Sequence, residues 1–269
     1  MEYYKDRWNN LTLYKNRVLK VFTTDKYRNH IYSHFLTGEE KMKNFDDSIQ
    51  ITIKNDKIAL LPNGNEIKLQ SDWQHMNSSQ VMCINFFLNY WSHPQDLKPF
   101  LDNIQLESGN KIVGTPVKII FEDEESSTDG TNVDFVIELE DGHKVFIEIK
   151  YTENGFGEAS SKVKKKNPNY YLNKKNTIHK EVDIEQHNYE KYYQFVRNIY
   201  LGQDGNYSVF LFPKANKSID NDYAKCSKEI IKNVDRYEFG KMYWENLVEL
   251  LPNDDFRLKY FGTEEDWKE

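Results

Sequence analysis

The chain has 269 residues, enough for one large domain with appendages, and its composition excludes several classes of protein. No apolar run approaches the roughly 20 residues that span a bilayer, and Cys83 and Cys226 supply neither a disulfide framework nor a zinc motif. The formal net charge of -7 argues against broad affinity for nucleic acid, although it leaves room for a local basic groove. Because the first ten residues also lack a secretory apolar segment, we expect a cytoplasmic protein.

Residues 1–77 are predicted to form a helical and β extension that packs on a core. The stretch 15–44 is typical of helix or loop. Short strands are predicted over residues 48–54, 57–61 and 66–70, separated by turn signals at 55–56 and 62–65.

Residues 78–213 contain the elements of the predicted core. In chain order these are a helix over 78–88, strands over 111–122, 133–139 and 144–150, a helix over 184–201 and a strand over 208–212. Ser78 or Asn77 can cap the first helix, and an Asp-Gly turn joins the second and third strands. The order predicts an α/β fold around one mixed sheet. Residues 214–269 are predicted to add a helical extension, with helices near 219–234 and 241–250.

Three ionisable residues, Asp134, Glu148 and Lys150, stand at the ends of the two strands that the Asp-Gly turn joins. Side chains alternate between the faces of a strand, so Glu148 and Lys150 share one face while Val145, Ile147 and Ile149 point the other way, into the core. The turn returns the chain so that Asp134 lies beside this pair. Two carboxylates suit a hydrated Mg²⁺, and a neighbouring lysine can act on the phosphate or water in phosphodiester hydrolysis. The alternative is an exposed hairpin whose charges are merely solvated.

Asp134, thirteen intervening residues and Glu148-Ile149-Lys150 resemble the PD-(D/E)XK nuclease signature, with Val133 in place of the proline. The sequence is similar, more specifically, to a bacterial family of restriction-endonuclease-like PD-(D/E)XK proteins. The segments that carry this resemblance are residues 78–80, 133–134, 146–153, 156–157, 192–198 and 210–213.

The resemblance implies a restriction-endonuclease-like core with the order α-β-β-β-α-β, in which a mixed sheet is flanked by helices. It implies that Asp134 and Glu148 bind Mg²⁺, with Mn²⁺ as an alternative, and that Lys150 assists the nucleophile. Gln80, at the start of the first core helix, and Gln194, in the later helix, would support this site. For Gln80 an ordinary role as a polar residue near a helix start is an equal alternative.

Further residues are candidates for contacts with nucleic acid. Lysines gather between the third strand and the later helix, where tyrosines are interleaved with them; the run is Lys162, Lys164, Lys165 and Lys166. The alternative is a solvated loop. Arg197 can bind a phosphate through two hydrogen bonds or form a salt bridge with Glu190 or another acid. Glu153 is either a further acid of the site or a loop anchor.

Together these patterns predict an Mg²⁺-dependent endonuclease that hydrolyses nucleic acid, with DNA as the expected partner and a restriction-like or defence-related role. Restriction-like enzymes often cut both strands as homodimers, and the sequence leaves this open. The alternatives are a catalytically inactive nuclease-fold module that binds nucleic acid, and a module that binds a protein partner.

Overall fold

The structure is a computed structural model, and it describes residues 3–22, 25–27, 30–61, 64–123, 132–157, 191–230, 234–251 and 254–267. The chain divides into two compact units. Unit 1 comprises residues 1–92 and 247–269, and unit 2 comprises residues 93–246. The sequence predicted domain boundaries after residues 77 and 213. In the structure, the helix after Ser78 belongs to unit 1 instead, and the sheet of unit 2 continues past Pro213.

Unit 1 combines helices with two small antiparallel sheets. Its helices are α1 (Tyr3–Arg17), η1 (Gly38–Asn44), α2 (Ser79–Phe87), η2 (Leu88–Tyr90), α9 (Asp254–Phe261) and η7 (Glu264–Trp267). Its strands are β1 (Asp25–Tyr27), β2 (His30–Tyr32), β3 (Thr52–Lys54), β4 (Ile58–Leu60) and β5 (Glu66–Lys68). The three predicted short strands are confirmed in β3, β4 and β5. The predicted cap is confirmed too, because the Ser78 hydroxyl accepts a hydrogen bond from the Val81 amide at 3.3 Å.

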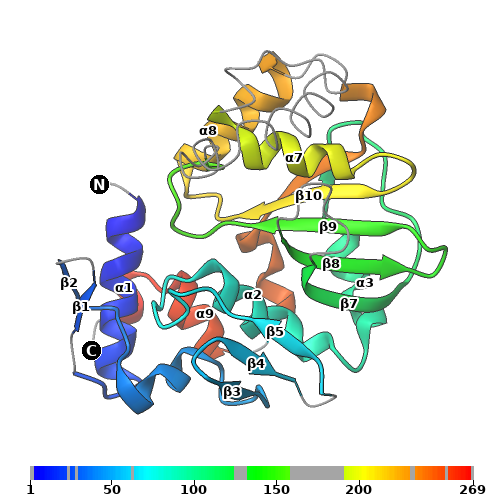
Figure 1. Ribbon diagram of the computed structural model, residues 1–269. Helices are drawn as coiled ribbons and strands as arrows, with labels where there is room; N and C mark the ends of the chain where they lie inside the picture. The colour runs from blue at the N-terminus through cyan, green and yellow to red at the C-terminus, as the bar shows by residue number, and fades with distance from the viewer. Residues whose placement is uncertain are drawn as a thin grey trace, which may run out of the picture. The chain divides into compact units, whose positions relative to one another are not determined.

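Unit 2 is built on a mixed six-stranded sheet (Figure 1). Its strands are β6 (Gln105–Leu106), β7 (Pro116–Asp123), β8 (Val133–Leu139), β9 (Lys144–Ile149), β10 (Tyr207–Phe212) and β11 (Phe239–Tyr243). They lie in the order β6-β11-β10-β9-β8-β7. Strands β7, β8 and β9 pair antiparallel, whereas β10 runs parallel to both β9 and β11. The chain is therefore mixed α/β, as predicted.

The helices of unit 2 are η3 (Pro94–Leu97), α3 (Lys98–Asp102), α7 (Tyr193–Leu201), α8 (Lys217–Lys225), the π-helical turn η4 (Cys226–Ile230) and η5 (Val234–Arg236), and η6 (Trp244–Leu250) spans the boundary between the units. In Figure 1, α7 lies alongside β10. An aromatic cluster that includes Phe195, Phe210 and Tyr223 buries the contact between helices and sheet. The part of the predicted helix 184–201 before residue 191 lies outside the described residues.

The helix predicted over residues 241–250 is wrong at its start, since β11 occupies Phe239–Tyr243. Pairing with β10 on one side and β6 on the other satisfies the backbone of this segment. Gly240 permits the close approach of β6, because a Cβ atom there would collide with the Gln105 carbonyl oxygen. None of the described helices combines the length and apolar character needed to cross a bilayer.

Candidate active site

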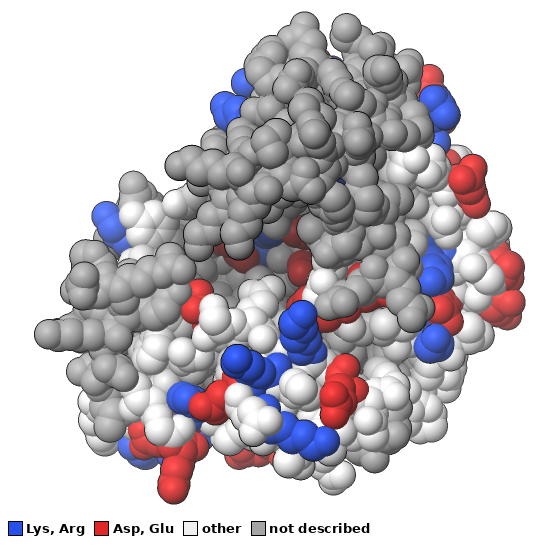
Figure 2. All heavy atoms as spheres, viewed as in Figure 1, with Lys and Arg blue, Asp and Glu red and all other residues white. Residues whose placement is uncertain are grey.

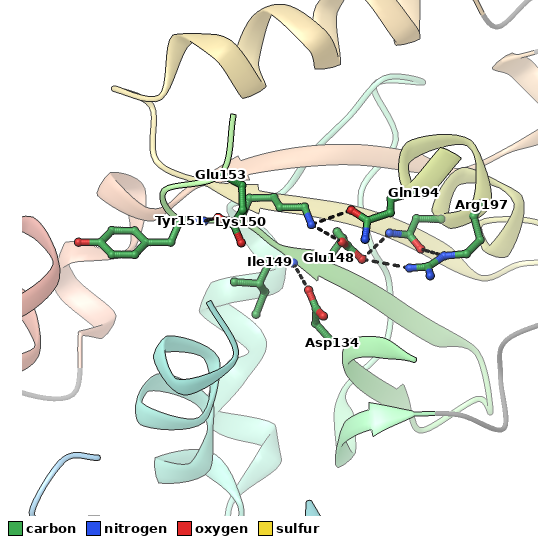
Figure 3. Close-up of polar contacts among 9 residues, drawn as sticks. Asp134, Glu148, Ile149, Lys150, Tyr151, Glu153, Gln194 and Arg197 are labelled. Carbon is green, nitrogen blue, oxygen red and sulfur yellow. Dashed lines mark hydrogen bonds and ion pairs between the residues drawn. The ribbon is translucent and has the colours of Figure 1, made fainter. Parts of the chain in front are cut away.

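Asp134 and Glu148 come from neighbouring antiparallel strands of unit 2. Phe135 pairs with Ile147 and Val136 with Phe146, so the same register, continued by one residue, places Asp134 opposite Glu148. Directly opposed residues of antiparallel strands project from the same face of a sheet. The Asp134 carboxylate also accepts a hydrogen bond from the Ile149 amide at 2.8 Å (Figure 3). The two acids therefore meet at the end of β9, as the hairpin pattern predicted.

The Glu148 carboxylate is buried, with 3 % of the residue exposed, and both of its oxygens have partners. Oε1 lies 2.8 Å from the Lys150 ammonium. Oε2 accepts hydrogen bonds from Asn198 Nδ2 at 2.6 Å and from Arg197 Nη2 at 3.3 Å. Since Lys150 is also buried, at 7 % exposed, these charges are not the solvated face of a surface hairpin.

Lys150 is held by a second side chain, Gln194 of α7, whose Oε1 accepts a hydrogen bond from the ammonium at 2.9 Å (Figure 3). The predicted orientation of Gln194 toward Lys150 is thus present. Gly157 makes room for this amide, because a Cβ at residue 157 would lie 2.7 Å from Gln194 Oε1. Gly157 also adopts a φ of +68°, which favours glycine.

Burial acts on all three ionisable groups, and their partners decide how each pKa moves. Burial raises the pKa of Asp134, and the nearby charges of Glu148 and Glu122 raise it further. Burial would also raise the pKa of Glu148, but the cations of Lys150 and Arg197 outweigh it and lower that pKa. For Lys150, burial favours a lower pKa, and the carboxylates around it, Glu148 first, raise the pKa instead. The network therefore favours an ionised Glu148 beside a charged Lys150.

The segment that follows β9 is fastened to the start of α8. Glu153 Oε2 accepts a hydrogen bond from the Tyr151 amide at 2.6 Å, so Glu153 is a loop anchor. Asn216, the N-cap of α8, donates to the carbonyl oxygens of Tyr151 at 3.1 Å and Glu153 at 2.9 Å. A pocket of about 660 Å³ borders this segment, and Lys150, Gln194 and Lys191 are among its lining residues. Lys150 therefore borders an open recess.

Of the other predicted site residues, the structure describes Gln80 and Arg197, and neither takes the predicted role at the site. Gln80 uses its side chain within unit 1, where it accepts from the Gln70 amide and donates to the Lys68 carbonyl oxygen, both at 2.9 Å. Arg197 is 6 % exposed and pairs with Glu148, which favours the salt-bridge alternative over a phosphate contact. The four lysines, Lys162, Lys164, Lys165 and Lys166, lie outside the described residues.

Asn198 is the residue that sequence reasoning missed. It follows Gln194 by four positions, so both residues lie on one face of α7. Asn198 and Arg197 are both buried, and Arg197 Nε donates to Asn198 Oδ1 at 3.0 Å. A run of polar residues on the inward face of an otherwise apolar helix is the signal that points to them.

The donor set fits a hydrated Mg²⁺ ion. No group of three or more His, Cys, Asp or Glu side chains suited to a metal occurs in the part of the chain that the structure describes. Mg²⁺ is usually held by one or two protein carboxylates and keeps several waters, so Asp134 and Glu148 suffice. Burial raises the pKa of Asp134, and the neighbouring Glu148 charge raises it further, so a divalent cation bound between the two carboxylates would favour the ionised form of Asp134.

Comparison with known proteins identifies a family for nearly the whole chain. The family model described as Restriction Endonuclease associating with ARP (REase-ARP) matches residues 4–267. No curated protein and no solved structure matches the sequence. Because the family match spans nearly all of the 269 residues, the chain belongs to the restriction-endonuclease-like family REase-ARP.

Proposed function

We propose that this chain is an Mg²⁺-dependent endonuclease of the PD-(D/E)XK type that hydrolyses phosphodiester bonds, with DNA as its expected substrate. The observation that carries the proposal is the convergence of Asp134, Glu148 and Lys150 at the ends of two paired strands. Asp134 and Glu148 would hold the metal, for which Mn²⁺ is an alternative. When bound, the metal would offset charge on the phosphate and lower the pKa of a coordinated water.

Lys150 is the residue that would act on the reacting groups. An ammonium has three N–H donors, and among the described residues Lys150 uses two of them, on Glu148 and Gln194. The third can donate to the attacking water or to a phosphate oxygen on which charge develops. Because Lys150 is largely buried, that hydrogen bond would be stronger than the same bond in bulk water.

Arg197, Asn198 and Gln194 would position this machinery from α7. Arg197 and Asn198 both bind Oε2 of Glu148, which restricts the carboxylate to one orientation. Gln194 restricts the Lys150 ammonium in the same way. One helix thus orients both a metal-binding carboxylate and the lysine, and such preorganisation is what phosphoryl chemistry requires of a protein.

Nucleic-acid binding would rely on local rather than overall charge. On the face shown in Figure 2, the described Lys and Arg side chains are interspersed with Asp and Glu side chains. The formal net charge of -7 also argues against a generally basic surface that would bind nucleic acid everywhere. We therefore propose that the lysine run at residues 162–166, which follows the catalytic strand in sequence, supplies contacts to the phosphate backbone.

The test is a cleavage assay with duplex DNA, single-stranded DNA and RNA, each with Mg²⁺, with Mn²⁺ and with EDTA. We expect DNA cleavage with either metal and none with EDTA. Asp134→Asn should bind Mg²⁺ more weakly in calorimetry and lose cleavage. If the parent protein cuts none of these substrates, or cuts them equally well in EDTA, the proposed function is wrong.

A protein partner is the second candidate role, and the family description is the observation that favours it, since it names association with ARP. We propose that this chain also associates with ARP. Co-purification of the two proteins at a fixed stoichiometry would support this role. It would become the leading candidate if such a complex formed while the chain alone neither bound nor cut nucleic acid.

A further inference from the structure

Unit 1 contains a cavity of about 170 Å³ whose wall combines aromatic and charged side chains. Four aromatic residues line it: Tyr14 from α1, Phe45, and Phe256 and Tyr260 from α9. All four are at most 5 % exposed. A cavity of about 150 Å³ accommodates one benzene-sized molecule, so this cavity suits a single small planar group.

Three carboxylates also line the cavity: Asp46, Asp47 and Asp255. Burial raises the pKa of the Tyr14 hydroxyl, and the charges of Asp255, Asp46 and Asp47 each raise it further. Acids from two distant parts of the chain therefore act on one hydroxyl group. The combination of aromatic faces with carboxylates is the surface that recognises organic cations.

The Tyr14 hydroxyl is the group in the cavity wall that can accept a hydrogen bond from a ligand. Tyr14 is 5 % exposed, yet its hydroxyl makes no hydrogen bond within the part of the chain that the structure describes. A tyrosine hydroxyl in the interior normally has a hydrogen-bond partner. Since Tyr14 lines the cavity, a donor placed there would satisfy its oxygen.

The two lysines that also line the cavity direct their ammonium groups to carbonyl oxygens. Lys43 Nζ donates to the Leu19 carbonyl oxygen at 3.4 Å. Lys259 Nζ donates to the backbone oxygen of Asn44 at 2.6 Å and to its side-chain oxygen at 2.9 Å. Burial also lowers the pKa of Lys259 to about 7, so its positive charge is only partial at neutral pH. The three carboxylates therefore leave an excess of negative charge.

We propose that this cavity binds a guanidinium group, either as a small free molecule or as an arginine side chain, and that Tyr14 and Asp255 contact it directly. A planar cation of this kind can stack on an aromatic ring while its N–H groups donate to the carboxylates and to the Tyr14 oxygen. The site lies within unit 1, and its proposed ligand is independent of the nuclease chemistry assigned to unit 2.

Isothermal titration of the full chain with methylguanidinium tests this inference, with neutral methylurea as the isosteric control. We expect saturable binding of methylguanidinium and none of methylurea. Tyr14→Phe and Asp255→Asn should each weaken binding at least fivefold. Asp254→Asn removes the neighbouring exposed carboxylate, which does not line the cavity, and should leave binding unchanged.

Thermal unfolding of each variant shows that its fold is intact, and Tyr14→Phe removes only the hydroxyl group. Binding of an arginine-containing peptide in addition to methylguanidinium would identify a side chain as the natural source, and binding of methylguanidinium alone a free molecule. The inference is overturned if the parent shows no saturable binding, if methylurea binds equally well, or if Asp254→Asn weakens binding as much as Asp255→Asn.

Discussion

Asp134 and Glu148 are both carboxylates at one sheet end, yet their pKa values move in opposite directions because their partners differ. The cations of Lys150 and Arg197 lower the pKa of Glu148 despite its burial, whereas burial raises the pKa of Asp134 and its hydrogen bond from the Ile149 amide only partly opposes this. Removal of one partner from a buried charge leaves its desolvation uncompensated. At the scale of the residue, the groups around Glu148 thus determine whether this carboxylate is ionised and correctly oriented for the proposed metal.

Asn198→Ala tests this positioning role. The substitution removes the 2.6 Å hydrogen bond to Glu148 Oε2 and leaves Arg197 alone to orient that oxygen. Loss of groups that orient metal ligands typically weakens metal affinity by about 10–100-fold. We expect a loss of that size in Mg²⁺ affinity, measured by calorimetry far below the unfolding temperature.

Asn103→Ala provides the control in the same unit, since Asn103 is exposed and its side chain, within the described part of the chain, donates to the Pro99 carbonyl oxygen and not to the site. A variant at Asn198 that lowers the unfolding temperature but binds Mg²⁺ as tightly as the parent would show that Asn198 has a purely structural role.

At the scale of the element, the site depends on how the segment after β9 approaches α7. Gly157 lies where that segment passes Gln194, at a distance too short for a side chain. The Asn216 cap of α8 fixes the same segment through the carbonyl oxygens of Tyr151 and Glu153. The orientation of Lys150 therefore depends on a packed arrangement of a strand end and two helices.

Gly157→Ala should disturb this arrangement in two ways, through strain at a positive φ and through a steric clash with Gln194. Its Cβ would lie 2.7 Å from Gln194 Oε1 and displace the amide from Lys150. Gly142→Ala is a matched control, because Gly142 also has a positive φ, +88°, but nothing lies within 4 Å of its Cβ. Each variant should lose about 1 kcal/mol of stability from strain.

Single-turnover cleavage distinguishes the two glycine variants. We expect Gly157→Ala to cut at least tenfold more slowly than Gly142→Ala at the same folded fraction. Equal rates for the two variants would show that the contact between residue 157 and Gln194 is irrelevant to the site.

At the scale of the whole molecule, a buried lysine makes the stability of the protein dependent on pH. Lys259 of α9 is 5 % exposed, and burial lowers its pKa to about 7, an effect that the charge of Asp46 only partly opposes. Between pH 7 and 10.5 the unfolded chain therefore binds more protons at this residue than the folded chain does. Stability from this group rises with pH across that window.

Urea unfolding at pH 7, 8 and 9 measures this effect. Between pH 7 and 9, the free energy of unfolding of the parent should rise by about 2 kcal/mol relative to that of Lys259→Met. Each pH unit above the pKa of the folded protein contributes roughly 1.4 kcal/mol. Lys43→Met, at an exposed lysine, should keep the pH dependence of the parent. If the parent and Lys259→Met respond identically to pH, Lys259 is protonated in the folded protein throughout this range.

The local elements of the chain were predictable because they depend on neighbouring residues. Alternation and the Asp-Gly turn define β8 and β9, and with them the meeting of Asp134 and Glu148. The contact of Gln194 with Lys150 was also predictable, from the family resemblance together with the position of Gln194 on the later helix.

Features that depend on tertiary packing could not be predicted in this way. β11 is a strand because β10 and β6 pair with it, which its helix-like sequence does not reveal. Arg197 resembled a phosphate ligand because its burial against Glu148 exists only in the folded protein. The cavity beside Tyr14 likewise brings α1 together with α9, from opposite ends of the chain.

The central claim is that Lys150 acts in phosphodiester cleavage. The most direct test compares the rate of DNA cleavage by Lys150→Ala with that of the parent at saturating protein and Mg²⁺. Lys150 would act only on the reacting groups, while most affinity for DNA comes from many backbone contacts. We predict at least a hundredfold slower cleavage with DNA affinity within about threefold of the parent. Joint removal of Lys164, Lys165 and Lys166 should instead weaken binding and its salt dependence but spare the saturated rate. A Lys150→Ala protein that cuts as fast as the parent would contradict the assignment of this site.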